Sequence, residues 1–154
     1  MKFMLNGALT IGTRDGATIE MAEEAGEENF FLFGLTAQQV AESRAWYSPR
    51  WHYDNQPEVR GALDLIFSDH FSPDEPGVFA ALRDTLLTHD HYMHLADLAA
   101  YLEADRRLVA LYADPDRWTR KAILNVAGSG KFSSDRTIAE YAADIWHVKP
   151  CPVS

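Results

Sequence analysis

The chain opens with Met1-Lys2-Phe3-Met4-Leu5-Asn6-Gly7-Ala8-Leu9-Thr10-Ile11-Gly12-Thr13. Within this stretch, Ala8 to Ile11 form a short apolar run that Gly12 closes, and Asp15-Gly16 follows as a turn signal. An apolar run of this kind before a glycine predicts a brief buried strand and a tight turn. Taken alone, Lys2 is one lysine near the start of a chain, and such a side chain is usually a solvated charge.

A helix and a second strand are predicted directly after the first strand. Ile19 and Met21 lie among glutamates, and Gly26 is placed to end a helix with a positive φ angle. The run from Phe30 to Gly34 is continuously apolar rather than alternating, which is typical of a parallel strand covered on both faces. The sequence therefore predicts a strand, helix, strand unit of an α/β fold.

The next segment combines a helix signal with a cluster of aromatic residues. Thr36 and Gln39 match a capping box, which predicts a helix that ends at about Arg44. Residues 46–53 lack helical periodicity and contain a proline, so we expect an ordered loop there. Their rings either form a platform for stacking sugars or pack against a neighbouring element, and packing is the commoner role.

From Pro57 onward the pattern is helical for most of the remaining length. Apolar residues recur at helical spacing, which predicts helices whose apolar faces pack in the core. Asp114-Pro115 predicts a capped helix start, and Ser134 or Thr137 is expected to cap the last helix. The residues of the predicted buried faces are Val59, Leu63, Phe67, Val78, Phe79, Leu82, Leu86, Leu98, Tyr101, Leu102, Leu108, Val109, Tyr112, Trp118, Ala122, Val126, Ile138, Tyr141, Ile145 and Trp146.

The composition limits the kinds of partner. The 154 residues, of which 47% are hydrophobic, fit a single domain without a linker or an internal repeat. A net charge of −9 without a basic block argues against nucleic acid and anionic membranes, because both attract positive charge. No apolar run approaches the about 20 residues of a membrane span, and the single cysteine, Cys151, rules out an internal disulfide. We therefore expect a soluble protein of the cytoplasm.

A histidine-rich stretch resembles a metal site but fits one poorly. His89, His91 and His94 lie around Asp90. Ligands on one face of a helix need spacings of three or four residues, and among the histidines only His91 and His94 have such a spacing. No metal site is predicted.

A second polar stretch resembles the end of a phosphate-binding loop. Gly128-Ser129-Gly130-Lys131 has the expected glycine and lysine, but Asn125 stands where the first glycine is needed. Phe132 occupies the position of the magnesium-binding Ser or Thr, so a nucleotide site is not predicted. No glycine elbow and no Ser, His and Asp pattern indicates a catalytic nucleophile.

Several longer stretches of the chain carry a family resemblance. They are Lys2 to Thr13, Asp15 to Ala17, Gly26 to Gly34, Ser129 to Ile138 and Ile145-Trp146. In these motifs and in their order, the chain from its first residue to about Val148 resembles the C-terminal part of the glycogen, or α-glucan, phosphorylases. Two positions depart from the family pattern. Arg14 stands where the family usually has an apolar residue, and Thr18-Ile19 stands where it has asparagine followed by a β-branched residue.

The resemblance implies a fold and a chemistry. The implied fold is the C-terminal Rossmann-like domain of a two-domain glycosyltransferase of the GT-B type, of which residues 1–154 form a part that is helix-rich towards its C-terminus. Lys2 matches the lysine that forms a Schiff base with pyridoxal 5′-phosphate. In the family, the phosphate of this cofactor relays a proton to the orthophosphate that attacks the terminal α-1,4 glucosyl unit, and glucose 1-phosphate leaves with its configuration retained. We expect an amine desolvated among Phe3, Met4 and Leu5 to lose its charge easily and to condense with the aldehyde.

The resemblance also implies that other functional parts lie upstream of Met1. These are the N-terminal domain, the lysine and arginines that bind phosphate, and the Gly-Thr-Gly-Asn stretch that precedes the lysine. We therefore expect a fragment that is inactive alone, whose parent is a homodimer acting on α-1,4-glucan and orthophosphate. Beside Lys2 as the cofactor anchor, no catalytic residue and no metal ligand is assigned.

Two other functions stay open. One is a non-enzymatic remnant of the fold that acts as an interaction or oligomerisation module. The other is an independent Rossmann-like binder of a phosphorylated ligand, which is disfavoured because no Gly-x-Gly-x-x-Gly follows the first strand.

Overall fold

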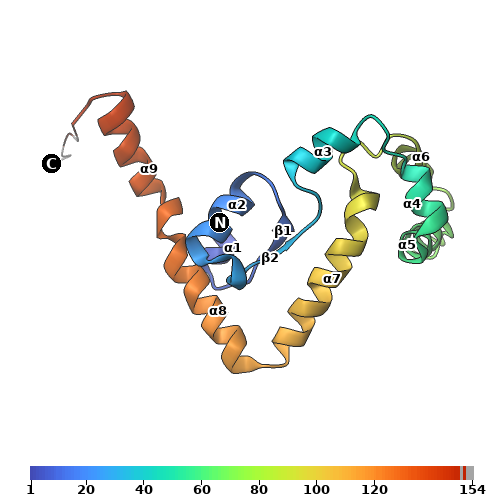
Figure 1. Ribbon diagram of the computed structural model, residues 1–154, viewed down its shortest axis with the longest axis horizontal. Helices are drawn as coiled ribbons and strands as arrows, with labels where there is room; N and C mark the ends of the chain where they lie inside the picture. Colours follow the sequence, from blue (N-terminus) through green and yellow to red (C-terminus); the bar gives the residue numbers. More distant parts are fainter. Residues whose placement is uncertain (150, 152–154) are drawn as a thin grey trace.

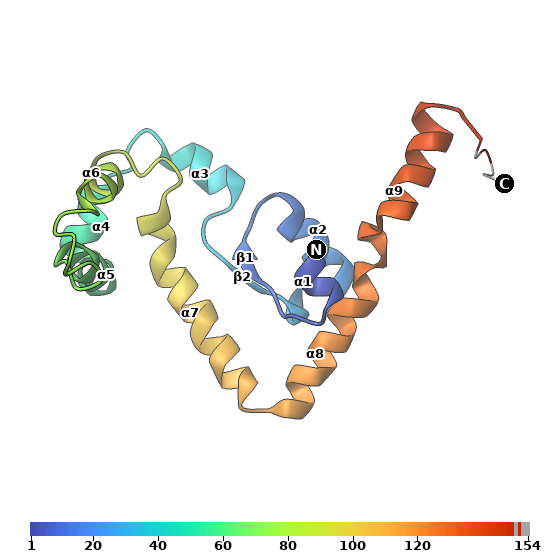
Figure 2. The ribbon, with the colours of Figure 1, turned by 180° about the vertical axis from the view of Figure 1, so that it is seen from behind.

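Two long helices arranged as a V form the frame of the molecule (Figures 1 and 2). The computed structural model describes residues 1–149 and 151. The arms are α7 (His94–Tyr112) and α8 (Pro115–Gly128). A small parallel sheet and two helices lie between the arms, and a group of short helices lies at the far end of α7.

The other elements follow the chain in order. They are α1 (Lys2–Leu5), β1 (Ile11–Thr13), α2 (Gly16–Ala25), η1 (Glu27–Asn29), β2 (Phe31–Phe33), α3 (Ala37–Ser43), α4 (Pro49–Asn55), α5 (Pro57–Phe67), α6 (Ala80–Thr88), η2 (Ser129–Phe132), α9 (Ser134–Glu140) and η3 (Tyr141–Ile145).

Both faces of the sheet are covered. β1 and β2 run parallel, with Ile11 beside Phe31 and Thr13 beside Phe33. Because successive side chains of a strand point to opposite faces, Phe31 and Phe33 pack with residues of α7, whereas Leu32 packs with α1 and α2. This arrangement confirms the predicted parallel strand, helix, strand unit, and Gly26 ends α2 with the expected positive φ of 85°.

The first strand begins later than predicted. The expected strand over residues 8–11 is found at Ile11–Thr13, and residues 2–5 form one helical turn that the sequence did not predict. Met4 explains the difference, since it is buried against α2 with only 1% of its surface exposed. The helical turn places the Met4 side chain in the core, and the chain then continues into β1.

Helices α4, α5 and α6 pack with the start of α7 around a second core. Val59 and Leu63 of α5 are buried together with Leu95 of α7. The predicted capping box is confirmed, because the Thr36 hydroxyl accepts from the Gln39 N–H and the Gln39 side chain accepts from the Thr36 N–H. This cluster extends the chain well away from the sheet (Figure 1).

The prediction of a loop for the aromatic segment was wrong. Residues 49–55 form α4, in which the Ser48 hydroxyl accepts a hydrogen bond from the Trp51 N–H and Pro49 occupies the first turn. A proline in the first turn begins a helix rather than breaking it, because its missing N–H has no partner there in any case.

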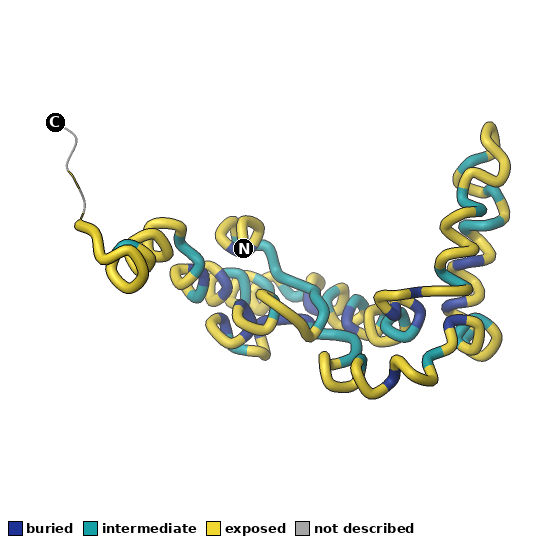
Figure 3. Tube along the Cα trace, turned by 90° about the horizontal axis from the view of Figure 1, so that it is seen from above, coloured by how far each residue is buried: buried dark blue, intermediate teal, exposed yellow. Residues whose placement is uncertain are grey.

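Several predicted buried faces are exposed in the structure. Helix α6 contains no buried residue, and Val126 of α8 is 42% exposed. In the last helices Ile138 is 57% exposed and Trp146 55%, in contrast to the predicted core position. Figure 3 shows that exposed positions dominate the trace near the C-terminus. These helices have the expected periodicity, but no described element covers their apolar faces.

The start of α7 is held by a buried carboxylate. Asp90 is 2% exposed, and its oxygens accept hydrogen bonds from the N–H groups of His94 and Leu95, each at 2.9 Å, and from the Tyr47 hydroxyl at 2.5 Å. Partial burial and the Asp90 carboxylate raise the pKa of the Tyr47 phenol far above its usual range. The Asp90 carboxylate thus joins the aromatic segment to the long helix.

A second carboxylate of α7 gives a testable pH dependence. Asp97 Oδ1 accepts a hydrogen bond from the Leu35 N–H at 2.9 Å, and burial raises the pKa of Asp97 above its ordinary value of 3.8. The folded state then binds the proton more tightly than the unfolded state, so stability is highest below the unfolded pKa and falls as the pH rises through the folded pKa.

We expect Asp97→Asn to raise the free energy of unfolding at pH 7. The amide oxygen of asparagine accepts the same hydrogen bond without a charge that burial disfavours. Urea denaturation at pH 7 and at about pH 4 measures the effect, and the advantage of the variant shrinks at the lower pH, where the wild-type carboxyl gains its proton. A variant that is less stable than the wild type at pH 7 contradicts this expectation.

Candidate cofactor-anchoring site

Helix α1 holds Lys2 on a single turn beside the core. Its position is set by the buried Met4, two residues further on. The turn is closed by Asn6, whose side-chain amide donates a hydrogen bond to the Lys2 carbonyl oxygen at 2.7 Å. Gly7 then adopts a positive φ of 80°, which redirects the chain towards β1. The backbone of Lys2 is therefore well fixed.

The side chain of Lys2 is exposed. Among the residues that the structure describes, its amine takes part in no ion pair and in no hydrogen bond. The expected desolvation is wrong for this chain, because Phe3 is 83% exposed and Leu5 49%. Successive positions of a helix point in different directions, so when Met4 faces the core its two neighbours cannot also enclose Lys2.

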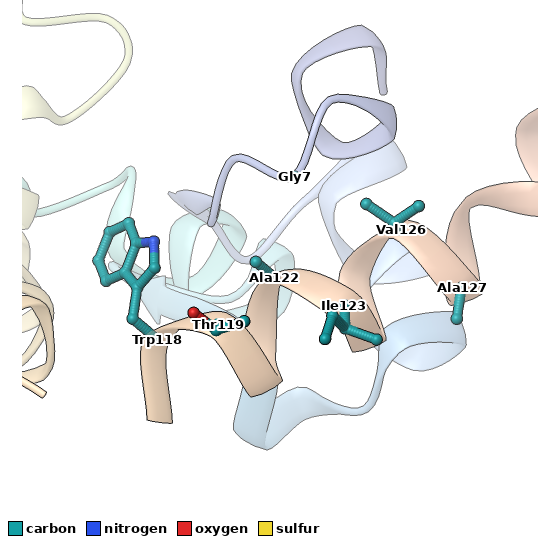
Figure 4. A pocket seen from close by; sticks show the side chains of 7 residues that line it. All are labelled: Gly7, Trp118, Thr119, Ala122, Ile123, Val126 and Ala127. Carbon is teal, nitrogen blue, oxygen red and sulfur yellow. The ribbon is translucent and has the colours of Figure 1, made fainter. Parts of the chain in front are cut away.

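An apolar groove lies between α8 and the loop after α1 (Figure 4). It encloses about 490 Å³, and its wall is almost entirely apolar. Figure 4 shows Trp118 at one end of the groove and Ala127 at the other, with Gly7 opposite the helix. The groove is lined by Gly7, Trp118, Thr119, Ala122, Ile123, Val126 and Ala127. It offers an apolar surface near the Lys2 turn but no charged group for a phosphate.

The stretch that resembles a phosphate-binding loop is structural. The amine of Lys131 donates to the Glu24 carboxylate at 2.5 Å, and this hydrogen bond raises the pKa of Lys131. Ser129 is 2% exposed, and its hydroxyl donates to the Val126 carbonyl oxygen at 2.6 Å. Lys131 thus joins η2 to α2, and Ser129 closes the end of α8.

The histidine-rich stretch is likewise part of the framework. The Asp90 carboxylate accepts hydrogen bonds from the start of α7 and from the Tyr47 hydroxyl, whereas its neighbours His89 and His91 are both exposed. Within residues 1–149 and 151, no group of three or more His, Cys, Asp or Glu side chains is arranged to hold a metal ion. In the same part of the chain, no helix is both long enough and apolar enough to cross a bilayer.

Two features escaped the sequence analysis. Asn125 was considered only as a departure from a phosphate loop, yet it is fully buried and its amide donates to the carbonyl oxygens of Asn29 at 3.1 Å and Lys121 at 2.9 Å. Trp46 and Trp51 were expected to pack, yet they are 74% and 54% exposed. A polar residue within an apolar helical face was the only available signal for Asn125.

Comparison with known proteins identifies the class. The family model described as carbohydrate phosphorylase matches residues 1–148, so the chain belongs to the carbohydrate phosphorylase family. The brain form of glycogen phosphorylase from Homo sapiens is 54% identical to it over 151 residues. The muscle forms from Bos taurus and Oryctolagus cuniculus are 52% and 51% identical over the same length. Each match covers 97% of this chain but only 18% of the relative, so the chain corresponds to a fragment of those proteins.

Proposed function

We propose that this chain is the C-terminal part of a glycogen, or α-1,4-glucan, phosphorylase. The observation that carries the proposal is the 54% identity to a glycogen phosphorylase over 97% of the chain. The parent acts on α-1,4-glucan and orthophosphate and releases glucose 1-phosphate. The parallel unit of β1, α2 and β2 supports the assignment of residues 1–154 to the C-terminal Rossmann-like domain of a GT-B fold.

Within this proposal, Lys2 is the covalent anchor of pyridoxal 5′-phosphate. A Schiff base requires an accessible primary amine, and the free amine of Lys2 on its fixed turn meets that requirement. When bound, the cofactor supplies a phosphate group that relays a proton to orthophosphate. The groove beside Gly7 offers an apolar wall, whereas Lys131 is occupied by Glu24. This chain therefore contributes the anchor, and the phosphate-binding cations belong to the rest of the parent.

Labelling with the cofactor tests the role of Lys2. We expect pyridoxal phosphate followed by borohydride reduction to label Lys2 several-fold more than any other lysine, as mapped by peptide mass spectrometry. The chain has only four lysines, of which Lys131 is paired with Glu24 and Lys121 donates to the Glu28 carbonyl oxygen.

Lys149 provides the matched control. Like Lys2 it is exposed, but it lies outside the helical turn that holds Lys2. Lys2→Arg should remove most of the label, and Lys149→Arg should leave it in place. Fragment ions must separate the Lys2 amine from the adjacent α-amino group of Met1, which is also reactive near neutral pH. Equal labelling of Lys2 and Lys149 would refute a selective anchor in this chain.

A second candidate function is an interaction or oligomerisation module. The exposed apolar side chains of the last helices, among them Ile138 and Ile145, favour it. Scattered labelling together with concentration-dependent association in sedimentation velocity would support this candidate over the first. For the parent we propose a cytoplasmic homodimer, without nucleic-acid or membrane partners.

A further inference from the structure

We infer that the aromatic pocket at the start of α4 is an accessory binding site for α-glucan chains. It encloses about 340 Å³ and is lined by Trp46, Tyr47, Ser48, Trp51 and His52. This volume is near the lower end of the about 300–1,000 Å³ found for small-molecule sites, and the pocket is open on one side. It suits a short stretch of a longer polymer rather than an enclosed ligand.

The tryptophans carry the first part of the argument. The packing that the sequence favoured does not occur, because Trp46 is 74% exposed and Trp51 54%. The backbone that carries them is held in place, since the Ser48 hydroxyl caps α4 and the Tyr47 hydroxyl donates to Asp90. Exposed rings on a fixed backbone lose little conformational freedom when a ligand stacks on them. The C–H faces of a sugar also match the apolar face of an indole.

A buried nitrogen of His52 also favours a ligand with hydroxyl groups. Nδ1 of His52 is buried and has no hydrogen-bond partner among the residues that the structure describes. The His52 ring packs edge-on against Trp51 with centroids 5.1 Å apart, so the nitrogen lies next to a stacking surface. A buried polar atom without a partner is costly, and a sugar hydroxyl both donates and accepts, so it satisfies this nitrogen in either tautomer.

The charges near the pocket favour a neutral ligand. The Arg50 guanidinium pairs with the Asp54 carboxylate at 3.3 Å and lies over the Tyr53 ring, and Arg44 lines a separate hollow with His89. Among the described residues, no Asp, Glu, Lys or Arg lines the pocket itself. Together with the net charge of −9, this disfavours a phosphorylated or acidic ligand. The choice of α-glucan among neutral ligands rests on the proposed function.

Native gel electrophoresis with and without glycogen in the gel tests the site. We expect glycogen to retard the chain, and Trp46→Ala and Trp51→Ala to need about tenfold more glycogen for the same retardation, as loss of one stacking ring implies. Both residues are exposed, so circular dichroism should show unchanged folding. Trp146→Ala, which removes a 55% exposed indole outside the pocket, should behave as the wild type.

The outcomes separate this site from the cofactor anchor. The Lys2→Ala variant should be retarded by glycogen as strongly as the wild type. If glycogen retards the chain but Lys2 is not labelled selectively, the glucan site is supported and the cofactor anchor is refuted. Selective labelling without any retardation overturns the glucan site alone. Equal retardation of all tryptophan variants also overturns it. If Trp46→Ala instead abolishes a dimer in sedimentation velocity without changing retardation, the pocket binds a second copy of the chain.

Discussion

Asn125→Asp is expected to lower the free energy of unfolding by about 3–5 kcal/mol, the range for a buried charge without a counter-ion. The Asn125 amide donates to the carbonyl oxygens of Asn29 and Lys121 and is 0% exposed. A carboxylate of the same shape has no hydrogen to donate and would face these oxygens with a negative charge. Urea denaturation at pH 7 measures the loss, which should shrink in acid as the new carboxyl gains a proton and donates again.

Asn55→Asp is the matched control for this substitution. The Asn55 amide also donates to the carbonyl oxygen four residues earlier, that of Trp51, at 2.8 Å, but the side chain is exposed. Water replaces the lost hydrogen bond there, so we expect a change within about 0.5 kcal/mol. Similar losses for both variants would contradict the role given to Asn125.

Gly128→Ala should be the second strongly destabilising change, at about 2–3 kcal/mol. A Cβ atom at Gly128 would lie 2.7 Å from the Glu24 carbonyl oxygen and 3.0 Å from the Cα atom of Ala25. These are backbone atoms of α2, so no side chain can rotate away, and α2 and α8 must separate. The thermal unfolding midpoint and the urea midpoint both report the loss.

Gly61→Ala supplies the opposite expectation for the same chemical change. Gly61 lies within α5, and nothing lies within 4 Å of an added Cβ atom. Alanine there should raise the free energy of unfolding by about 0.5–1 kcal/mol, because it favours the helix more than glycine does. If Gly128→Ala stabilises the protein as well, the close approach of α2 and α8 is not a constraint.

Some local signals predicted local structure, but the expected cap at Ser134 or Thr137 is wrong, because α9 begins after Ser133 without a side-chain cap. The capping box at Thr36, the cap at Asp114 and the glycine that ends α2 are confirmed because each depends on residues within about one helical turn. The helix at residues 49–55 was missed, although Ser48-Pro49 contains the same kind of signal. The aromatic composition of this segment favours a loop, but the cap and the proline in the first turn decide its structure.

Side-chain environments were predicted less well because they depend on distant contacts. Asn29, one of the two partners of Asn125, lies 96 residues away, and the partner of Lys131 lies 107 residues away. The exposure of Lys2 depends on which face of α1 Met4 occupies, and periodicity cannot reveal that in a helix of four residues. The family resemblance identified Lys2 as a candidate, but not its surroundings.

The separation of the two packing centres along the chain sets an expected order of assembly during synthesis. The cluster of Val59, Leu63 and Leu95 uses contacts within a stretch of about forty residues, so it can form early. The sheet needs Phe31 to meet Leu111, and α1 packs against α8 as well as α2, so the packing of the Lys2 turn is incomplete until α8 has left the ribosome. The Lys2 turn thus precedes the cluster of Val59, Leu63 and Leu95 in the chain but is completed after it, so a ligand that requires the finished turn binds only once α8 has been synthesised.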